Sequence, residues 1–273
     1  FGGWQTDVSA ATKKNLPKAP SIIGESAILI EPTTGTIIYE KDPHKKMYPA
    51  SITKIMTALL AIENCKMNDT VVYSKKNLDS LTAEDSNIQC QVGEKMSVKD
   101  CLYALMLSSA NETATALAEH IAGSEEEFVK QMNTRAKKLG MNNTNFIDCC
   151  GLTDSDDHYT TAKDVATMSR ELITKYPEIF KYSTIWMEMF THKTAKGESK
   201  FMLTNTNKLL KVNKYVKGLK TGSTSKAKYC VSTVAEKDNV ELIAVVMAAA
   251  DYKERFNISQ KLINYGFANC KVY

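Results

Sequence analysis

Residues 49–63 read PASITKIMTALLAIE, and this stretch governs both the fold and the chemistry expected of the chain. Ser51 and Lys54 stand three positions apart at the start of a run whose apolar residues recur at helical spacing. The density of apolar residues predicts a helix over residues 51–64 that is buried on most sides. One turn of such a helix would place the serine and the lysine side by side.

Ser51 has two readings, a helix cap or a nucleophile. Serine is a good N-cap, but a capping box has Glu or Gln three residues later, and Lys54 takes that place here. The helix dipole disfavours a cation in the first turn. A partly desolvated lysine at that end has a lowered pKa, and it can accept the hydroxyl proton of a nucleophilic serine. An S-x-x-K pair alone occurs by chance in many proteins, so other stretches must decide.

The composition excludes several classes of protein. The chain has 273 residues, of which 43% are hydrophobic and 24% charged, as in a soluble globular protein with a large core. Its 35 basic and 31 acidic residues are spread along the chain without a basic stripe, so we expect no nucleic-acid partner. No run approaches the roughly 18 apolar residues of a membrane helix. No signal peptide is visible and the chain starts at Phe1, so we expect a processed or trimmed chain.

Cysteines and histidines show no spacing typical of a metal site. The seven cysteines include no C-x-x-C pair, and the four histidines include no H-E-x-x-H. Adjacent Cys149 and Cys150 could bind a metal or form a redox pair, but buried or idle thiols are the simpler interpretation. His120 falls in an amphipathic helical pattern, which favours a structural role. We therefore expect no metal and no cofactor.

The order of elements predicts a mixed α/β fold. Residues 1–24 are polar and are expected to form an N-terminal arm. β-Branched runs around a glycine-containing turn predict a hairpin in SAILIEPTTGTIIYEKD. The remaining elements are expected as helices over 98–107, 112–122, 125–139, 161–176 and 253–265, and strands over 216–221, 229–235 and 240–249. Residues 25–273 should form one domain, with an antiparallel sheet flanked by helices from 25–50 and 212–273 and a mainly helical region from 51–211.

Two further stretches support the nucleophile. SSANET contains Ser109 and Asn111 just after a predicted helix, and VKGLKTGSTSKAKYC contains Lys220, Thr221 and Gly222 at the end of a predicted strand. The ordered set S-x-x-K, S-x-N and K-T-G resembles the serine penicillin-recognising enzymes. This resemblance implies a β-lactamase/transpeptidase-like fold.

A closer resemblance is to the D-alanyl-D-alanine carboxypeptidases, the low-molecular-mass penicillin-binding proteins of the DD-peptidase family. PASITKIMT is similar to their PAS-x-TK-x-MT signature, and similarity continues through YEKDPHKKMYPAS, LSSANETATALAEHIAGS, LTNTNKLL and LINYGF, over about residues 26–267. The resemblance implies an extracytoplasmic bacterial enzyme that removes the terminal D-alanine from peptidoglycan stem peptides and is acylated by β-lactams. Family members often continue into a small β-rich domain and an amphipathic membrane anchor, so membrane association is expected only through segments absent from this chain.

The resemblance also implies a role for each residue of the three motifs. Ser51 would attack the carbonyl between the two terminal D-alanines, with Lys54 as its general base. Ser109 would relay a proton towards the leaving amine, and Asn111 would orient Lys54 and the substrate amide. Lys220 would add positive potential that helps keep Lys54 neutral and the substrate carboxylate bound.

The remaining expected site residues bind substrate. Thr221 and Thr224 would hydrogen-bond the carboxylate, and Gly222 would let the strand edge approach the substrate backbone. The backbone N–H groups of the nucleophile and of Ser223 would form the oxyanion hole. Arg255 matches an arginine that helps hold the carboxylate, although a solvated residue at a helix start explains it equally well.

The chain departs from the family pattern at several positions. The usual K-T-G-H-T has Ser223 in place of histidine, and Cys150 stands where the family commonly has a histidine before Gly-Leu. Lys217 replaces the aspartate of V-D-G, and residues 227–229 read AKY in place of AGY. Because Ser223 would donate through its backbone, we expect acylation to persist while turnover differs from that of relatives.

Proteins with several other functions carry the same motifs. A class A β-lactamase needs a glutamate in an omega-type loop, but no E-x-x-L-N precedes the K-T-G stretch, and SAN stands where SDN is usual. A transpeptidase or endopeptidase uses the same groups with another acceptor or another bond. A non-enzymatic penicillin-sensing or peptidoglycan-binding module would need the site to be blocked or slow.

Overall fold

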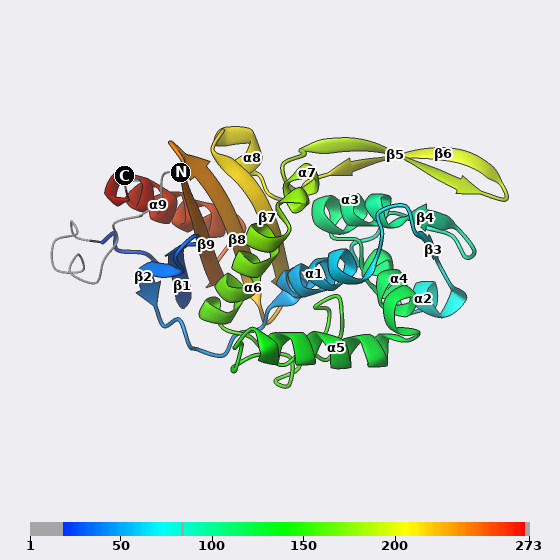
Figure 1. The fold of residues 1–273 in the computed structure, drawn as a ribbon, viewed down its shortest axis with the longest axis horizontal. Coiled ribbons are helices and arrows are strands. Elements are labelled where there is room, and N and C mark those ends of the chain that lie inside the picture. Colours follow the sequence, from blue (N-terminus) through cyan, green and yellow to red (C-terminus); the bar gives the residue numbers. More distant parts are fainter. Residues whose placement is uncertain (1–18, 83–84, 271–273) are drawn as a thin grey trace, which may run out of the picture.

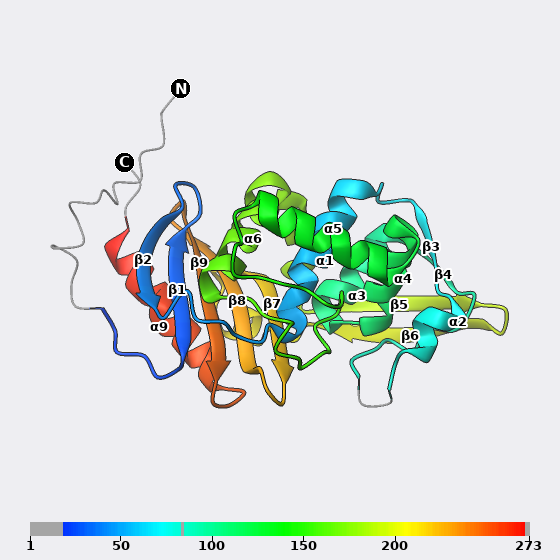
Figure 2. The same ribbon diagram turned by 90° about the horizontal axis from the view of Figure 1, so that it is seen from below.

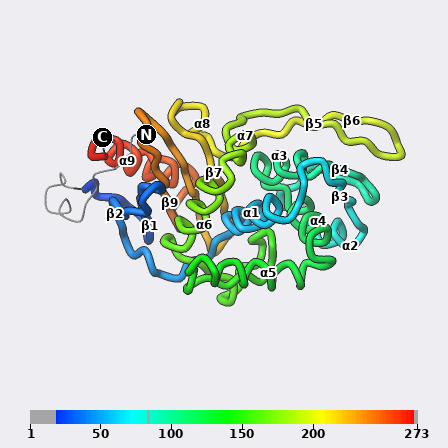
Figure 3. Tube along the Cα trace, in the orientation of Figure 1, coloured from blue at the N-terminus to red at the C-terminus, as the bar shows by residue number. Residues whose placement is uncertain are grey.

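A computed structural model describes residues 19–82 and 85–270 and shows a sheet region joined to a helical region (Figure 1). The sheet is antiparallel and draws on both ends of the chain, as the blue and red ends of the trace in Figure 3 show. Its strands in spatial order are β2 (Thr36–Lys41), β1 (Ser26–Glu31), β9 (Val240–Ala249), β8 (Lys228–Lys237) and β7 (Val216–Thr224). The predicted α/β class with an antiparallel sheet flanked by helices is therefore confirmed.

Two apolar clusters lie on opposite faces of this sheet. Helix α9 (Glu254–Asn269) packs on one face with Leu262 and Ile263 buried, and α6 (Ala162–Lys175) packs on the other (Figure 2). β9 is covered on both faces, and its residues are apolar almost throughout, as burial on two sides requires.

The helical region lies beside the sheet and contains the core helix predicted from the opening stretch. Its elements are η2 (Ala50–Thr53), α1 (Lys54–Asn64), α2 (Lys75–Asp79), α3 (Val98–Ser108), α4 (Asn111–Ala122), α5 (Glu125–Lys138), η3 (Pro177–Ile179) and α7 (Phe180–Ser183). A further short helix, α8 (Leu209–Val212), lies against β7 of the sheet. α1 begins next to β7 and runs away from the sheet among α3, α4, α5 and α6. Within residues 19–82 and 85–270, no helix combines the length and apolar character needed to span a bilayer.

Four short or exposed strands were not predicted. β3 (Thr70–Val72) pairs with β4 (Lys95–Ser97), and β5 (Met187–Thr194) pairs with β6 (Gly197–Thr204) as a hairpin along the helical region. Besides its helices, the region 51–211 therefore also contains these four strands. Most side chains of the β5–β6 hairpin are exposed or half-buried and many are polar, so the alternation that identifies a half-buried strand is weak there.

The predicted N-terminal arm falls mostly on residues 1–18, which lie outside the described residues. Of its described part, Ile22 is 7% exposed and packs in the α9-side core cluster. The backbone oxygen of Ile22 accepts a hydrogen bond from Lys41 Nζ at 3.2 Å. Residues that precede the first strand therefore contribute to the core.

Candidate active site

Ser51 lies on a tight turn that leads into the core helix. Residues 50–53 form the 3₁₀ helix η2, and the α-helix begins only at Lys54, so the expected single helix over 51–64 is corrected at its start. Ser51 caps neither helix, because the N-cap positions are Pro49 and Thr53 and neither makes a side-chain cap bond. The capping interpretation of Ser51 is therefore wrong.

Lys54 is the centre of the polar cluster at this turn. Its side chain is fully buried, and its Nζ atom lies 2.8 Å from Ser51 Oγ, 3.1 Å from Ser109 Oγ and 2.7 Å from Asn111 Oδ1. The backbone oxygen of Cys150 accepts a fourth hydrogen bond at 3.0 Å. The structure thus brings together the serine and lysine of the first motif and the serine and asparagine of the second.

The two partners of Lys54 that can only accept hydrogen bonds can be satisfied by a neutral amine. The Asn111 side-chain oxygen and the Cys150 carbonyl can only accept hydrogen bonds, and the two N–H groups of a neutral amine satisfy both. The amine lone pair then remains for a proton from a hydroxyl, and Ser51 Oγ stands within reach. This arrangement is what a general base for a serine nucleophile requires.

Burial also favours the neutral amine electrostatically. Desolvation lowers the pKa of Lys54, although Cys150, Cys149, Asp148 and Asp85 oppose this shift. Burial likewise holds the pKa of Lys220 well below that of an ordinary lysine, and the charges of Lys54 and Arg255 lower it further.

The second motif is positioned by the junction of two helices. Ser109 adopts the left-handed conformation (φ +56°) at the end of α3, which turns the chain so that Asn111 can begin α4. The backbone N–H of Asn111 donates to the Ser86 oxygen at 2.9 Å, which fixes this helix start to the preceding loop. Both side chains are at least 95% buried, so their aim at Lys54 is set by packing.

Strand β7 brings the third motif against the turn of Ser51. β7 is an edge strand of the sheet, and a Cβ atom placed on Gly222 would lie 2.8 Å from the backbone nitrogen of Ser51. Only glycine allows this approach without displacing one of the two backbones. Lys220 lies beneath, 1% exposed, with its Nζ atom donating to the Thr221 backbone oxygen at 3.0 Å.

The three motifs border a cleft of about 390 Å³. Arg255 lines it while only 4% exposed, and its guanidinium lies over the rings of Tyr252 and Phe256, at 5.0 and 4.7 Å from the ring centroids. The interpretation of Arg255 as a solvated residue is therefore wrong. The lining residues are Ser51, Ser86, Ser109, Thr204, Asn205, Thr206, Lys208, Thr221, Gly222, Ser223, Tyr252 and Arg255.

The two threonines expected to bind the substrate carboxylate, Thr221 and Thr224, lie in different surroundings. The Thr221 hydroxyl lies in the cleft and pairs with the Thr206 hydroxyl at 2.6 Å. The Thr224 hydroxyl is bonded to Asp154 and also accepts from the backbone N–H of Ala227 at 3.0 Å, and Thr224 does not line the cleft. Thr224 would have to leave Asp154 before it could bind a ligand there.

The structure places the residues at which the chain departs from the family pattern. Cys150 contacts Lys54 through its backbone carbonyl, while its thiol donates to the Asn111 backbone oxygen at 3.5 Å and lies 3.8 Å from the Cys149 sulfur. The hydrogen bond from Lys54 to Cys150 therefore does not depend on the Cys150 side chain. Ser223 is exposed at the cleft, and Lys217 lies away from the cleft, where it pairs with Glu236 at 2.6 Å.

Sequence reasoning missed several residues of the cleft wall. Thr206, Asn205 and Lys208 come from the stretch LTNTNKLL, and Tyr252 precedes Arg255 by three positions. LTNTNKLL carries the one usable signal, since it is polar, rich in Asn and Thr, and part of the family resemblance. The contribution of Ser86 had no local signal, because a loop serine acquires its place only from the packing of α4.

Two groups of possible metal ligands lie apart from the cleft and were also missed. They are Cys65, Asp69 and His120, and Cys90, Glu94 and His192. Each group combines residues distant in the sequence, which no local spacing reveals. All seven cysteines are free thiols, and the sulfurs of Cys149 and Cys150 lie 3.8 Å apart, too far for a disulfide bond.

Comparison with known proteins gives a consistent result. The sequence model of the D-alanyl-D-alanine carboxypeptidase family matches residues 13–251. The D-alanyl-D-alanine carboxypeptidase DacF of Bacillus subtilis is 41% identical over 254 residues, which cover 91% of this chain and 63% of that protein. DacC of Escherichia coli is 34% identical over 92% of this chain and 62% of its own length. The chain thus spans slightly less than two thirds of these two relatives.

A solved structure resembles nearly the whole chain. The crystal structure of the Streptomyces K15 DD-transpeptidase superimposes with a TM-score of 0.86 at 29% identity, covering 92% of this chain and 100% of that one. The expected β-lactamase/transpeptidase-like fold is thereby supported by a second, independent comparison.

Proposed function

The chain belongs to the D-alanyl-D-alanine carboxypeptidase family, and we propose that it releases the terminal D-alanine from peptidoglycan stem peptides ending in D-Ala-D-Ala. The observation that carries this proposal is the fully buried Lys54 amine held 2.8 Å from the hydroxyl of Ser51 at the cleft. A buried lysine with a lowered pKa is suited to removing a hydroxyl proton. We assign the catalytic domain to residues 25–273.

Acylation follows from the contacts of Lys54. The neutral amine takes the Ser51 proton while Oγ forms a bond to the carbonyl carbon of the penultimate D-alanine. Charge develops on the carbonyl oxygen, and we assign its stabilisation to the backbone N–H groups of Ser51 and Ser223. The tetrahedral intermediate then breaks its C–N bond. The leaving amine receives the proton held by Lys54, relayed by Ser109, and free D-alanine departs.

Deacylation completes the cycle without a cofactor. Water adds to the ester carbonyl and gives up its proton to Lys54, and the C–O bond to Ser51 breaks with return of that proton to the serine. Asn111 orients the lysine in both halves, because its side-chain oxygen accepts from Nζ at 2.7 Å. The departures at Ser223 and Cys150 concern side chains and leave these contacts in place.

The substrate carboxylate is assigned to the far wall of the cleft. Thr221 and Arg255 line it there, and the arrival of a carboxylate would favour the charged form of the adjacent buried Lys220. Ser223 supplies its backbone N–H, and Gly222 keeps the strand edge open. Thr224 is assigned the weakest role, since its hydroxyl is bonded to Asp154.

β-Lactams are proposed to acylate the same serine. They present a strained amide to Ser51 and a carboxylate to the Thr221 wall, and the opened ring stays attached because no separate leaving group departs. A slowly hydrolysed adduct is expected. The peptidoglycan substrate implies action outside the bacterial cytoplasmic membrane.

A transpeptidase is the second candidate, because the solved relative at TM-score 0.86 is named a DD-transpeptidase. The acyl-enzyme is the same, and an amine rather than water attacks the ester. The products separate the two activities: a carboxypeptidase yields the shortened peptide acid, and a transpeptidase yields an amide of the added amine.

Release of free D-alanine from a synthetic peptide ending in D-Ala-D-Ala tests the proposed function. We expect release by the intact chain, with Ser51→Ala as the background control. An added amine acceptor should change the product only if transfer competes with hydrolysis. A release rate equal to the Ser51→Ala background, with and without acceptor, would show that the chain is not an active peptidase. If penicillin still acylated such a protein, a sensing module would be the better assignment.

The pH dependence of acylation is predicted from the environment of Lys54. Its pKa is lowered by burial, and the neutral amine is the base. The acylation rate should therefore rise about tenfold per pH unit at low pH and level off below the pH at which an ordinary lysine titrates. Mass spectrometry of penicillin adducts formed at a series of pH values measures this. Lys54→Arg, which cannot lose its charge, should abolish the rise. A rate in the intact chain that falls as the pH increases would contradict this role.

A further inference from the structure

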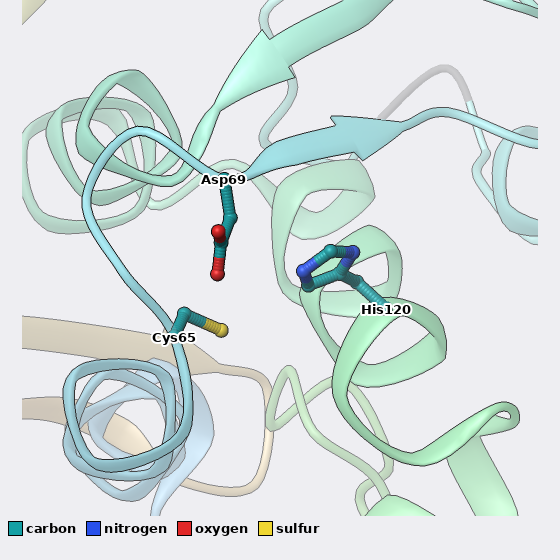
Figure 4. Close-up of side chains that lie close together, drawn as sticks. All are labelled: Cys65, Asp69 and His120. Carbon is teal, nitrogen blue, oxygen red and sulfur yellow. The ribbon is translucent and has the colours of Figure 1, made fainter.

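Three side chains of metal-ligand type converge at the ends of α1 and α4 that point away from the catalytic cluster. Cys65 is the C-cap residue of α1, Asp69 lies in the loop before β3, and His120 lies in the last turn of α4 (Figure 4). Their sulfur, carboxylate oxygen and imidazole nitrogen all lie within 4.8 Å of one another. Figure 4 shows the three side chains pointing into one shared space.

The ligand atoms of these three side chains are available to bind an ion. Among the described residues, neither the Cys65 thiol nor the His120 imidazole has a hydrogen-bond partner, and one Asp69 oxygen accepts from the Lys66 backbone N–H at 2.8 Å while the other remains. Cys65 and Asp69 are half-buried and His120 is exposed, which gives an entry path for an ion. The backbone bond to Asp69 also fixes the carboxylate, as outer partners of metal ligands commonly do.

The local field favours a cation. The C-terminal ends of α1 and α4 meet here, and each carries partial negative charge. The last turn of α1 has no basic residue, and that of α4 has only His120.

We propose that Cys65, Asp69 and His120 bind a zinc ion, with water in the fourth position. Thiolate, carboxylate and imidazole together are ligands typical of Zn²⁺, and Mg²⁺ or Ca²⁺ would call for oxygen ligands throughout. Binding displaces the thiol proton to solvent, and one thiolate with one carboxylate balances the charge of the ion. The ligand atoms lie within 4.8 Å of one another, and rotation of the exposed His120 side chain allows them to approach the shorter separations of tetrahedral coordination.

The ion would join two helices that carry catalytic groups at their other ends. α1 begins at Lys54 and ends beside Cys65, and α4 begins at Asn111 and ends beside His120. Eleven residues of α-helix separate Lys54 from Cys65, or about 16 Å, so the zinc would not touch a ligand in the cleft. Its role would be to fix the relative position of α1 and α4.

Titration with Co²⁺, which substitutes for zinc and absorbs when bound to thiolate, tests the site directly. The reduced full chain should bind one equivalent and develop the thiolate-to-cobalt absorption, which added Zn²⁺ should abolish. Cys65→Ser and His120→Ala should each lose the absorption. Cys90→Ser is the matched control, because it removes a cysteine of the other possible metal group and should leave the absorption unchanged.

Thermal unfolding provides a second readout. Zinc at about 100 times its dissociation constant should raise the Tm of the intact chain and of Cys90→Ser by roughly 5–10 °C, and leave that of His120→Ala unchanged. His120 is exposed, so its replacement should fold even if Cys65→Ser does not. No cobalt absorption in the intact chain, absorption that survives His120→Ala, or loss of absorption in Cys90→Ser would each overturn the assignment.

Discussion

Replacing Ser51 with alanine is expected to lower the rate of D-alanine release by at least about 10⁴-fold and to abolish the penicillin adduct. The hydroxyl is the atom that forms the acyl-enzyme, and among the described residues no other group within hydrogen-bond reach of Lys54 Nζ lies on the turn beside Gly222. A 10⁴-fold loss corresponds to about 5 kcal/mol of transition-state stabilisation. Ser51 is half-buried and caps no helix, so the free energy of unfolding should change by less than about 1 kcal/mol.

The matched control is Ser225→Ala, which removes an exposed hydroxyl from the turn between β7 and β8, outside the cleft lining. It should acylate and turn over like the intact chain. Intact mass after incubation with penicillin reports the adduct, and circular dichroism reports the fold. A Ser51→Ala protein that still gained the mass of one penicillin would move the nucleophile elsewhere, with Ser109 the first site to examine.

Replacing Gly151 with alanine is expected to destabilise the fold by at least about 3 kcal/mol and to reduce acylation in any protein that folds. Gly151 has φ +83°, a conformation that costs an L-residue roughly 1–2 kcal/mol. Its new Cβ atom would lie 1.7 Å from the backbone oxygen of Ala50, so one of the two backbones must move. Ala50 directly precedes Ser51, and a displacement of about 1 Å at a catalytic group can cost 10²-fold in rate.

Gly123→Ala separates the cost of the positive φ from the cost of the close contact. Gly123 has the same φ of +83°, but a Cβ atom there would have nothing within 4 Å. It should therefore show only the conformational penalty, with normal acylation. Urea unfolding of both variants, together with penicillin acylation rates, gives the comparison. Equal free energies of unfolding for the two variants would mean that the contact between Gly151 and Ala50 does not constrain the turn.

The sequence predicted the catalytic residues and the order of elements better than it predicted the contacts that hold those residues in place. Lys54 was informative because a cation is unfavourable at a helix start, and the structure shows it buried among the expected partners Ser109 and Asn111. The order of strands and helices likewise predicted a sheet made from both ends of the chain. The order of elements depends on residue type and periodicity, which are local properties, whereas the partnership of Lys54 with Ser109 and Asn111 was expected from the family resemblance.

Other features arise only when distant segments meet. Nothing local predicts that the carbonyl of Cys150 accepts from Lys54, because any residue has a carbonyl. The bond between Thr224 and Asp154 likewise joins the end of β7 to a loop that is far away in sequence. The start of α1 was misplaced for a related reason: the left-handed Ala50 and the contact with Gly151 shape the turn, and neither follows from the apolar pattern.

The order of strands in the sheet has a consequence for how the chain is made. β1 lies between β2 and β9, so Ser26 pairs with Met247, and the strand that closes the cleft, β7, is joined to β1 only through β8 and β9. A nascent chain that has not yet emerged past residue 249 therefore carries Ser51 and Lys54 without the strand network that sets Gly222 against them. Contacts between such distant segments form slowly. Reactivity towards penicillin should accordingly arise only after β9 has emerged, so truncated chains ending before β9 would escape the antibiotic.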